Sequence, residues 1–300
     1  MKKVIRVGTR KSPLAMKQTK LVVTDLQQVF PELAFEVVEL GTKGDRDKQT
    51  ALSQFGKEGI FTDEIGQAIK SGTIDFAVHS LKDLPTVLTE GLILASHPKR
   101  ENPFDSLIMR TATSLETLPV GAVIGTSSLR REIELLRLRP DVTPVSIRGN
   151  IDQRLAQLAK GDFDGIILAN AGLNRLGWQN HEGFSLVSFD QERFIPSVGQ
   201  GILGLECRKG DHYIQRILAS VADPETMSCA AAERAFLLGM STLEANQTSA
   251  AYAHVQGDEI VLTVMRGSRQ PGDYQRNVYK GKDGHALGLA AAQGMRKLDD

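Results

Sequence analysis

Apolar and polar positions alternate along the first hundred residues in blocks that predict strands and helices in turn. Short apolar runs predict strands, and apolar residues at helical spacing predict helices. The expected strands are 4–8, 35–40, 74–78 and 92–95, and the expected helices are 13–30 and 62–69. Ser12 is suited to cap the first helix, with Pro13 in its first turn. This alternation favours a parallel sheet with crossover helices.

The same pattern recurs between residues 103 and 196. Apolar runs predict strands near 106–109, 122–125, 143–147 and 165–168, and an expected helix at 151–160 ends at Gly161. Two proline-containing segments, 98–103 and 194–201, are the expected crossings between the two blocks. Two crossings between two α/β lobes favour a cleft with hinge strands, which is the architecture of solute-binding proteins.

The pattern changes after residue 224. An alanine-rich stretch predicts a helix at 225–240, and then a hairpin of strands at 250–255 and 259–265, a strand at 274–279 and a helix at 286–298 are expected. The predicted fold class is therefore α/β, with two lobes around a cleft and a small α+β C-terminal domain. The predicted domains are 1–98 with 200–220, then 103–196, then 222–300.

The overall composition narrows the functional classes. The 300 residues are 41% hydrophobic and carry no net charge, so no global field would recruit nucleic acid or an anionic membrane. No apolar run approaches the roughly 20 residues of a membrane span, and no signal peptide is recognised. Cys207 and Cys229 do not have metal-ligand spacing, which argues against a zinc site or a disulfide framework. We therefore expect a cytoplasmic protein without a metal site.

The strongest chemical candidate is the segment His79-Ser80-Leu81-Lys82-Asp83-Leu84-Pro85. It follows an apolar strand, and loops at the carboxyl ends of strands bind ligands in open α/β sheets. The Asp83 carboxylate stands beside the Lys82 ammonium and near the Ser80 hydroxyl. Such a loop is able to hold an anion and to place one negative charge beside a developing cation. A solvated ion pair at a strand end is the alternative explanation.

Arginines are concentrated in the second block. Residues 130–154 contain six arginines, no lysine and four acids, and arginine binds carboxylates through two parallel hydrogen bonds. The segment 125–131 places hydroxyl groups where a strand turns into a helix, which suits either an anion site or simple helix capping. Two of these six, Arg148 and Arg154, and two arginines outside the segment, Arg10 and Arg175, stand near strand ends or in helical segments. Their convergence would suit a ligand with several carboxylates.

Five motifs in order resemble the hydroxymethylbilane synthase family, also called porphobilinogen deaminase. They are 9–15, 79–85, 125–131, 148–150 with Arg154, and 198–201, and the match runs from about residue 4 to residue 240. The resemblance implies two domains of the type II periplasmic-binding-protein kind and a small third domain. It also implies a monomeric transferase of porphyrin biosynthesis that joins four porphobilinogen units head to tail and releases ammonia.

The resemblance implies roles for individual residues as well. Asp83 would stabilise the positive charge on the reacting pyrrole and help to move protons, and Gln200 would line the cleft near the hinge. The carboxylates of a dipyrromethane cofactor and of the growing chain would be held by Arg10, Ser12, Lys82, Thr126, Ser127, Arg130, Arg131, Arg148, Arg154 and Arg175.

Two segments depart from the family pattern. Family members carry a Gly-Gly-Cys loop whose cysteine holds the dipyrromethane through a thioether, whereas Ala245 or Asn246 stands there in this chain. In the segment 55–61, Glu58 replaces the usual lysine, with Lys57 beside it. Covalent attachment through the usual loop is therefore not possible.

Three functions remain open at this point. The first is an active synthase whose primer is held without the usual thioether. The second is a non-catalytic relative that binds porphobilinogen-like polycarboxylates, and the third is a generic solute-binding receptor. The retained Asp83 favours the first, because a cleft that only binds anions would lose affinity through a carboxylate at its centre.

Overall fold

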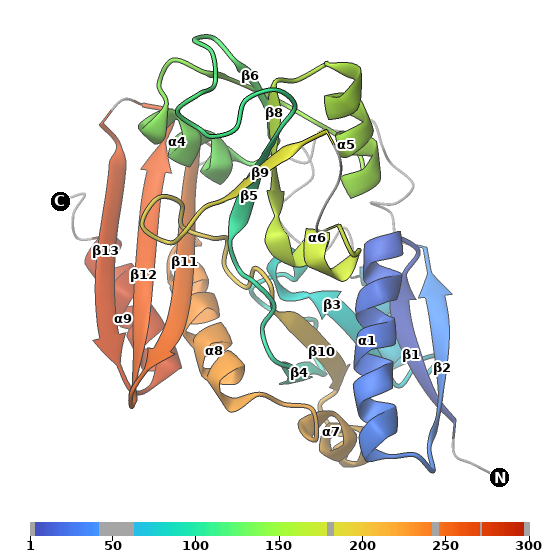
Figure 1. Ribbon diagram of the computed structural model, residues 1–300. Helices are drawn as coiled ribbons and strands as arrows, with labels where there is room; N and C mark the ends of the chain where they lie inside the picture. Colours follow the sequence, from blue (N-terminus) through green and yellow to red (C-terminus); the bar gives the residue numbers. More distant parts are fainter. Residues whose placement is uncertain (1–3, 42–62, 179–182, 242–245, 271, 297–300) are drawn as a thin grey trace. The chain divides into compact units, whose positions relative to one another are not determined.

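A computed structural model describes residues 4–41, 63–178, 183–241, 246–270 and 272–296 (Figure 1). The chain divides into two compact units. The first unit comprises Met1–Arg100 and Ile202–Ala230, and the second comprises Glu101–Gly201 and Ala231–Asp300. The finer division into three domains stays a prediction. Among the described residues, no helix is long and apolar enough to span a membrane.

The first unit contains a mixed sheet with the strand order β2-β1-β3-β10-β4. Its strands are β1 (Val4–Arg10), β2 (Ala34–Leu40), β3 (Phe76–Ser80), β4 (Leu92–Ser96) and β10 (Leu203–Arg208). Its helices are α1 (Pro13–Val29), α3 (Asp63–Lys70) and α7 (His212–Ala219), and a short 3-10 turn, η1 (Leu81–Asp83), follows β3. The prediction of a parallel sheet is wrong for β10, which runs antiparallel to both β3 and β4. The chain reaches β10 only after passing through the second unit. Local periodicity therefore could not show the direction of this strand or its place in the sheet.

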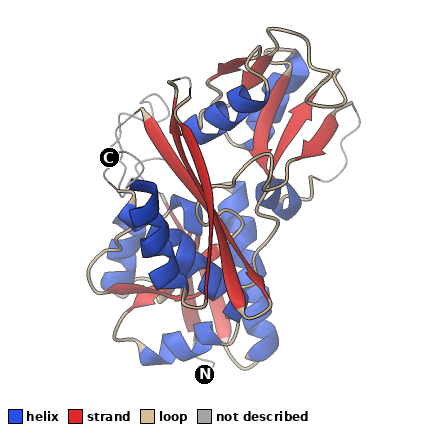
Figure 2. Ribbon diagram, turned by 90° about the vertical axis from the view of Figure 1, so that its left-hand side faces the viewer, coloured by secondary structure: helices blue, strands red, loops and turns tan. Residues whose placement is uncertain are grey.

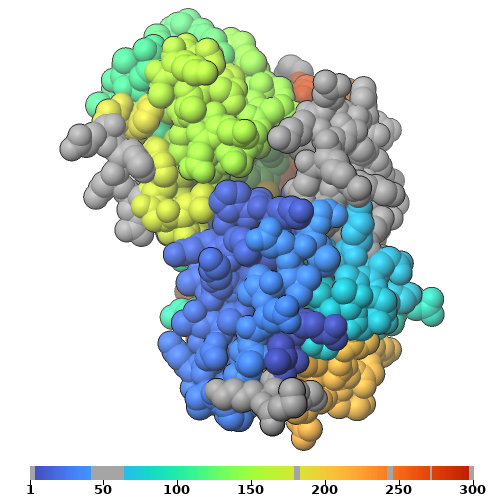
Figure 3. Space-filling model, turned by 90° about the vertical axis from the view of Figure 1, so that its right-hand side faces the viewer, coloured from blue at the N-terminus to red at the C-terminus, as the bar shows by residue number. Residues whose placement is uncertain are grey.

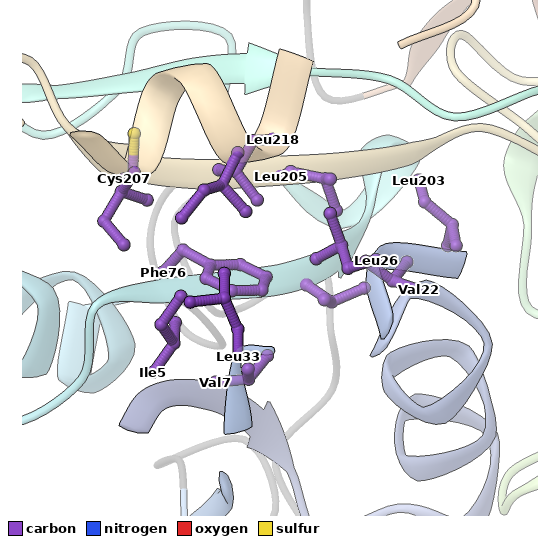
Figure 4. Packing of buried hydrophobic residues seen from close by; sticks show 13 residues of the cluster. Ile5, Val7, Val22, Leu26, Leu33, Phe76, Leu203, Leu205, Cys207 and Leu218 are labelled. Atoms are coloured by element: carbon purple, nitrogen blue, oxygen red, sulfur yellow. The ribbon is translucent and has the colours of Figure 1, made fainter. Parts of the chain in front are cut away.

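The main core of the first unit lies between this sheet and the helices α1 and α7. Alternate residues of the central strands, such as Val7, Phe76 and Leu205, are fully buried, and α1 adds Val22 and Leu26 from one face (Figure 4). Figure 3 shows α1 and β2, in blue, on the surface of this unit. The predicted strand at 74–78 is displaced by two residues, because β3 continues to Ser80 and brings its polar end to the sheet edge.

The second unit contains another mixed sheet, with the order β7-β6-β8-β5-β9. Its strands are β5 (Asp105–Met109), β6 (Val123–Gly125), β7 (Thr143–Val145), β8 (Gly165–Ala169) and β9 (Ser185–Ser188), and its helices are α4 (Leu129–Leu138), α5 (Ile151–Lys160) and α6 (Asn170–Arg175). Strand β6 is parallel to β7 and β8, whereas β5 is antiparallel to β8 and β9. The expectation of a purely parallel sheet is therefore wrong here too.

A small antiparallel sheet confirms the predicted C-terminal α+β region. Its strands are β11 (Gln247–Gln256), β12 (Glu259–Ser268) and β13 (Tyr274–Gly281), with helices α8 (Pro224–Gly239) and α9 (Gly284–Arg296) before and after them (Figure 2). Ala250 and Met265 of this sheet pack with Ile133 of α4 and with Ile195. Apolar contacts therefore connect the small sheet to α4 within the second unit.

Candidate functional site

In the first unit, several of the predicted site residues lie at one edge of the sheet. Strands β1 and β3 are parallel neighbours, so their carboxyl ends meet at the same edge. Arg10 is the last residue of β1, and the Ser12 hydroxyl accepts the Ala15 N–H at 3.2 Å as the N-cap of α1. Gln18 of α1 donates to the Ser80 hydroxyl at 2.9 Å. The start of α1 is thereby tied to the end of β3.

The turn η1 exposes the two charged residues of the central motif. Leu81 and Leu84 are buried together with Ile202, and the Leu81 N–H donates to the Ile202 carbonyl at 2.9 Å. Lys82 and Asp83, between the two leucines, are exposed. The apolar positions therefore anchor the turn, and the ammonium and the carboxylate lie on its solvent-exposed side.

In the second unit, the hydroxyl groups before α4 make local hydrogen bonds. The Ser128 hydroxyl accepts the Arg131 N–H as the N-cap of α4, and the Thr126 hydroxyl accepts the Ser128 N–H at 3.2 Å. The Ser127 hydroxyl donates to the Ile147 carbonyl at 2.6 Å and accepts the Ile147 N–H at 3.1 Å. Helix capping accounts for Ser128, while Ser127 joins this turn to the segment after β7.

A buried carboxylate that the sequence reasoning missed connects three of the predicted residues. Asp105 is 1% exposed, and its Oδ2 accepts a hydrogen bond from Arg130 at 2.6 Å. Its Oδ1 accepts from Arg131 at 2.7 Å and from the Gln200 side chain at 2.9 Å. Burial alone would raise the pKa of Asp105, but the charges and hydrogen bonds of Arg130 and Arg131 outweigh it and hold this pKa well below its usual range. Asp105 begins an apolar strand, so its sequence context indicated no role.

Three arginines in the second unit form a group of like charges, which we call the arginine cluster: Arg131, Arg148 and Arg154. Burial, together with the positive charges of Arg131 and Arg148, lowers the pKa of Arg154 to about 10. The Arg154 Nε donates to the Gly149 carbonyl at 2.8 Å. Gly149 has a φ of 109°, and a Cβ there would lie 2.8 Å from the Gln153 side chain. Glycine therefore lets the backbone turn closely beneath Arg154.

Arg175 and Gln200 are buried and bonded to backbone carbonyls. Arg175 donates to the Gly201 carbonyl at 2.7 Å, and burial lowers its pKa to about 10, against the opposing charge of Glu101. Gln200, which is 0% exposed, also donates to the Pro103 carbonyl at 2.7 Å. Both side chains therefore stabilise the chain segments near residues 101–105 and 197–201.

The structure thus brings together three groups of predicted residues. Arg10, Ser12, Lys82 and Asp83 share one edge of the first sheet, Arg130, Arg131 and Gln200 share Asp105, and Arg131 also belongs to the arginine cluster. Thr126, Ser127 and Arg175 have their own backbone partners. Whether each residue binds a ligand stays a prediction.

The positions where the chain departs from the family pattern are described only in part. Lys57, Glu58 and Ala245 lie outside the described residues, and Asn246 is an exposed turn residue before β11. Cys207 and Cys229 are buried, and burial raises the pKa of the Cys207 thiol to about 12. Neither cysteine has the exposure of a reactive thiol.

Comparison with known sequences gives consistent matches over most of the chain. A family model described as the porphobilinogen deaminase, dipyromethane cofactor binding domain, matches residues 5–216. A porphobilinogen deaminase of Listeria welshimeri is 48% identical over 237 residues, which cover 79% of this chain and 77% of that protein. The porphobilinogen deaminase of Bacillus subtilis is 42% identical over 306 aligned residues, which cover 100% of this chain and 96% of that protein.

Comparison with solved structures gives more distant matches. The periplasmic VFT2 domain of BvgS from Bordetella pertussis aligns with a TM-score of 0.41 at 14% identity, covering 73% of this chain and 86% of that one. The periplasmic aliphatic sulphonate-binding protein SsuA from Escherichia coli aligns with a TM-score of 0.43 at 15% identity, covering 80% of this chain and 71% of that one.

Proposed function

Because this chain belongs to the porphobilinogen deaminase family and is a transferase of tetrapyrrole biosynthesis, we propose separate tasks for two sets of its residues. The reaction joins four porphobilinogen units head to tail and releases ammonia at each step. The arginine cluster would hold the carboxylates of the polypyrrole. Asp83 would stabilise the positive charge that develops on the reacting pyrrole.

The observation that carries this proposal is the grouping of three cations in the arginine cluster. Burial is the main cause of the lowered pKa of Arg154, and the positive charges of Arg131 and Arg148 lower it as well, because like charges repel one another. Each pyrrole carries an acetate and a propionate, so two linked pyrroles bring four carboxylates. Each charge-assisted hydrogen bond to such a carboxylate contributes about 1.5–3 kcal/mol. A polycarboxylate therefore removes the repulsion and gains several strong contacts.

Asp83 suits the reacting pyrrole because it is exposed on an anchored turn. Loss of ammonia leaves an electron-poor azafulvene, and the nitrogen of the attacking pyrrole becomes cationic. A carboxylate held in place before the reaction stabilises this charge without reorganising, and it is able to accept the proton that leaves. The packing of Leu81 and Leu84 supports such a fixed position. Lys82, Arg10 and Ser12, at the same sheet edge, are proposed to bind substrate carboxylates.

Further residues of the second unit are proposed to line the polypyrrole site. Thr126 and Ser127 lie at the turn before α4, Arg175 donates to the Gly201 carbonyl, and Gln200 donates to the Pro103 carbonyl. Arg130 belongs to the same network through Asp105.

The family model is that of the dipyrromethane cofactor-binding domain, so the chain takes this group. When bound, the dipyrromethane supplies the pyrrole to which the first porphobilinogen is joined. The residues fit an ionic hold on this primer: the arginine cluster matches its carboxylates, whereas both cysteines of the chain are buried. We propose that the primer is retained by charge and not by a thioether.

Intact mass measured under native and then denaturing conditions, after incubation with porphobilinogen, tests this proposal. We expect a pyrrole adduct in the native spectrum only, together with released ammonia. An adduct that survives denaturation would contradict the ionic hold, and peptide mapping would identify its attachment residue. Bare protein without ammonia would contradict the catalytic role of Asp83 and leave a non-catalytic binder. Asp83→Asn incubated with a preformed dipyrromethane and porphobilinogen is the matched control, because it should keep the bound primer and lose ammonia release.

We propose in addition that the enzyme acts as a cytoplasmic monomer with no nucleic-acid or membrane partner. The net charge of zero supports the absence of nucleic-acid and membrane partners, because no global field would attract them. Light scattering coupled to size exclusion would test the monomer, and a mass of twice 32.7 kDa would contradict it.

A further inference from the structure

We propose that His79 and Glu206, a buried pair in the first unit, are positioning residues for the turn η1. They fix the register of β10 against β3, and this register sets the place of Lys82 and Asp83. The inference rests on the proposed function, because it concerns the turn that carries Asp83. The proposed function itself gives neither His79 nor Glu206 a task.

His79 and Glu206 face each other across two neighbouring strands. The Nε2 atom of His79 lies 3.2 Å from the Oε2 atom of Glu206, and the two side chains are only 5% and 4% exposed. Neither atom makes a hydrogen bond to any other residue in the described part of the chain. At these atoms each group is therefore the partner of the other, and separating them would leave two polar groups unpaired away from water, which is costly.

A buried ion pair is a weak source of stability. Taking both groups out of water costs about as much as their attraction returns, and apolar side chains of similar volume are often at least as stable in the same place. Buried polar groups are better suited to selecting one arrangement among several, as in the register of coiled coils. We therefore expect this pair to act on the position of the strands more than on stability.

Other features of β10 determine its register only weakly. Leu203, Leu205 and Cys207 share the face that packs on α1 and α7, so a shift by two residues would place one leucine where another had been (Figure 4). The chain passes through the second unit between β3 and β10, so no short hairpin turn sets the pairing. The pairing of β10 with β4 is irregular between Leu205 and Glu206. The register therefore depends mainly on the opposite face of β10.

That opposite face carries residues of different size and charge. Gly204 pairs with His79, and Glu206 reaches His79 from the next position on the same face. A shift by two residues in either direction would bring a side chain into the place of Gly204, where a Cβ would lie 2.9 Å from a methyl group of Leu94. That methyl group is able to move aside, so the steric penalty is small.

The ion pair adds a penalty of its own to both shifts. In one direction Glu206 moves about 7 Å farther from His79, at about 3.4 Å per residue. In the other direction Glu206 is forced into the narrow place of Gly204 beside Leu94. The present geometry of the pair is therefore compatible with the observed register only.

The register decides where Ile202 lies beneath η1. The Ile202 carbonyl accepts the Leu81 N–H at 2.9 Å, and its side chain packs with Leu81 and Leu84. Ile202 directly precedes β10, and β3 passes directly into η1. A change of register would therefore move the support beneath Asp83.

The test replaces both members of the pair at once, so that no buried group loses its partner. Two apolar double variants of different shape serve this purpose: His79→Leu with Glu206→Val, and His79→Val with Glu206→Leu. We expect their urea midpoints to stay at or above that of the unmodified protein, and their kcat for ammonia release to fall at least about tenfold. The amides of Leu81 and Leu84 should exchange with deuterium at least about tenfold faster.

A polar double variant tests whether the polar contact is what matters. In His79→Gln with Glu206→Gln the two side-chain amides are able to hydrogen-bond to each other, so kcat should return to within about threefold of the unmodified value. Leu205→Met is the matched control, because it changes a buried side chain on the other face of β10 with little change of volume. It should keep kcat within about twofold.

A normal kcat in the apolar double variants would overturn the inference, because backbone pairing and Gly204 would then be sufficient. A polar double variant no more active than the apolar ones would overturn it too. The same holds if neither apolar variant folds, because the pair would then be needed for stability and not for position. If the unmodified protein releases no ammonia, the proposed function fails, and amide exchange at Leu81 and Leu84 still decides whether the pair positions the turn.

Discussion

Replacing Leu81 by alanine tests whether apolar packing beneath η1 positions Lys82 and Asp83. Leu81 is 1% exposed and packs with Leu84 and Ile202, directly before the two charged residues. Leu26 offers a matched control, because it is 0% exposed but packs in a different apolar cluster of the first unit. It lies on α1, about 21 Å along the helix axis from Ser12 at about 1.5 Å per residue.

Each leucine-to-alanine change removes the same buried atoms and leaves a cavity, so each should cost about 3 kcal/mol of unfolding free energy. This loss leaves the domain folded if its stability is in the ordinary range of about 5–15 kcal/mol. The two variants should differ in catalysis. A turn that has lost its anchor no longer holds Asp83 in place, and a loss of about 1.4 kcal/mol of transition-state stabilisation lowers kcat about tenfold.

Urea titrations give the unfolding free energy of both variants, and initial rates of ammonia release from porphobilinogen give kcat. We expect Leu81→Ala to lose at least about tenfold in kcat, and Leu26→Ala to lose less than about twofold, at similar stability losses. If the two variants have equal kcat values, the idea that the buried Leu81 positions Lys82 and Asp83 is refuted.

Three further predictions concern the arginines and cysteines. Arg154→Gln should weaken binding of the dipyrromethane by about 10-fold to 150-fold, which corresponds to about 1.5–3 kcal/mol. Isothermal titration calorimetry measures this affinity, and an unchanged value would show that Arg154 does not contact the ligand. The pKa values of Arg154 and Arg175 are lowered to about 10, so both side chains lose their charge as the pH rises through that value. The affinity of the unmodified protein for the dipyrromethane should therefore fall around pH 10, and that of Arg154→Gln should fall less steeply. Cys207, whose pKa is raised to about 12, should resist alkylation by iodoacetamide at neutral pH until the protein is unfolded, and the Cys207→Ala and Cys229→Ala variants should keep the primer. Loss of the primer in either cysteine variant would contradict the ionic hold.

Much of the fold could be predicted from local pattern. The strands β1, β2, β5 and β8 and the helices α1, α5 and α8 follow from apolar periodicity and from caps such as Ser12 and Gly161. These features are local, since a period of two or of 3.6 residues depends only on neighbouring side chains. The small C-terminal sheet was predictable for the same reason.

Sequence motifs also predict the chemistry of the candidate site. The polar end of β3, with Lys82 and Asp83 between two leucines, indicates a loop that holds an anion, and the arginine-rich segment 130–154 indicates a ligand with several carboxylates. The type of side chain determines which ligand chemistry is possible, and this information is complete in the sequence.

The tertiary structure decided which strands pair in each sheet and which partners each of several similar side chains has. Strand β10 enters its sheet antiparallel between β3 and β4, from a part of the chain far along the sequence. Arg130 and Arg131 are identical neighbours in sequence, yet Arg130 donates to Ser197, Ile195 and Asp105, whereas Arg131 donates to Ile167 and Asp105 and belongs to the arginine cluster. Asp105, which accepts hydrogen bonds from both, lies 25 residues from Arg130 along the chain. Burial and hydrogen-bond partners arise only when such distant segments meet, and this is why the sequence alone could not distinguish these roles.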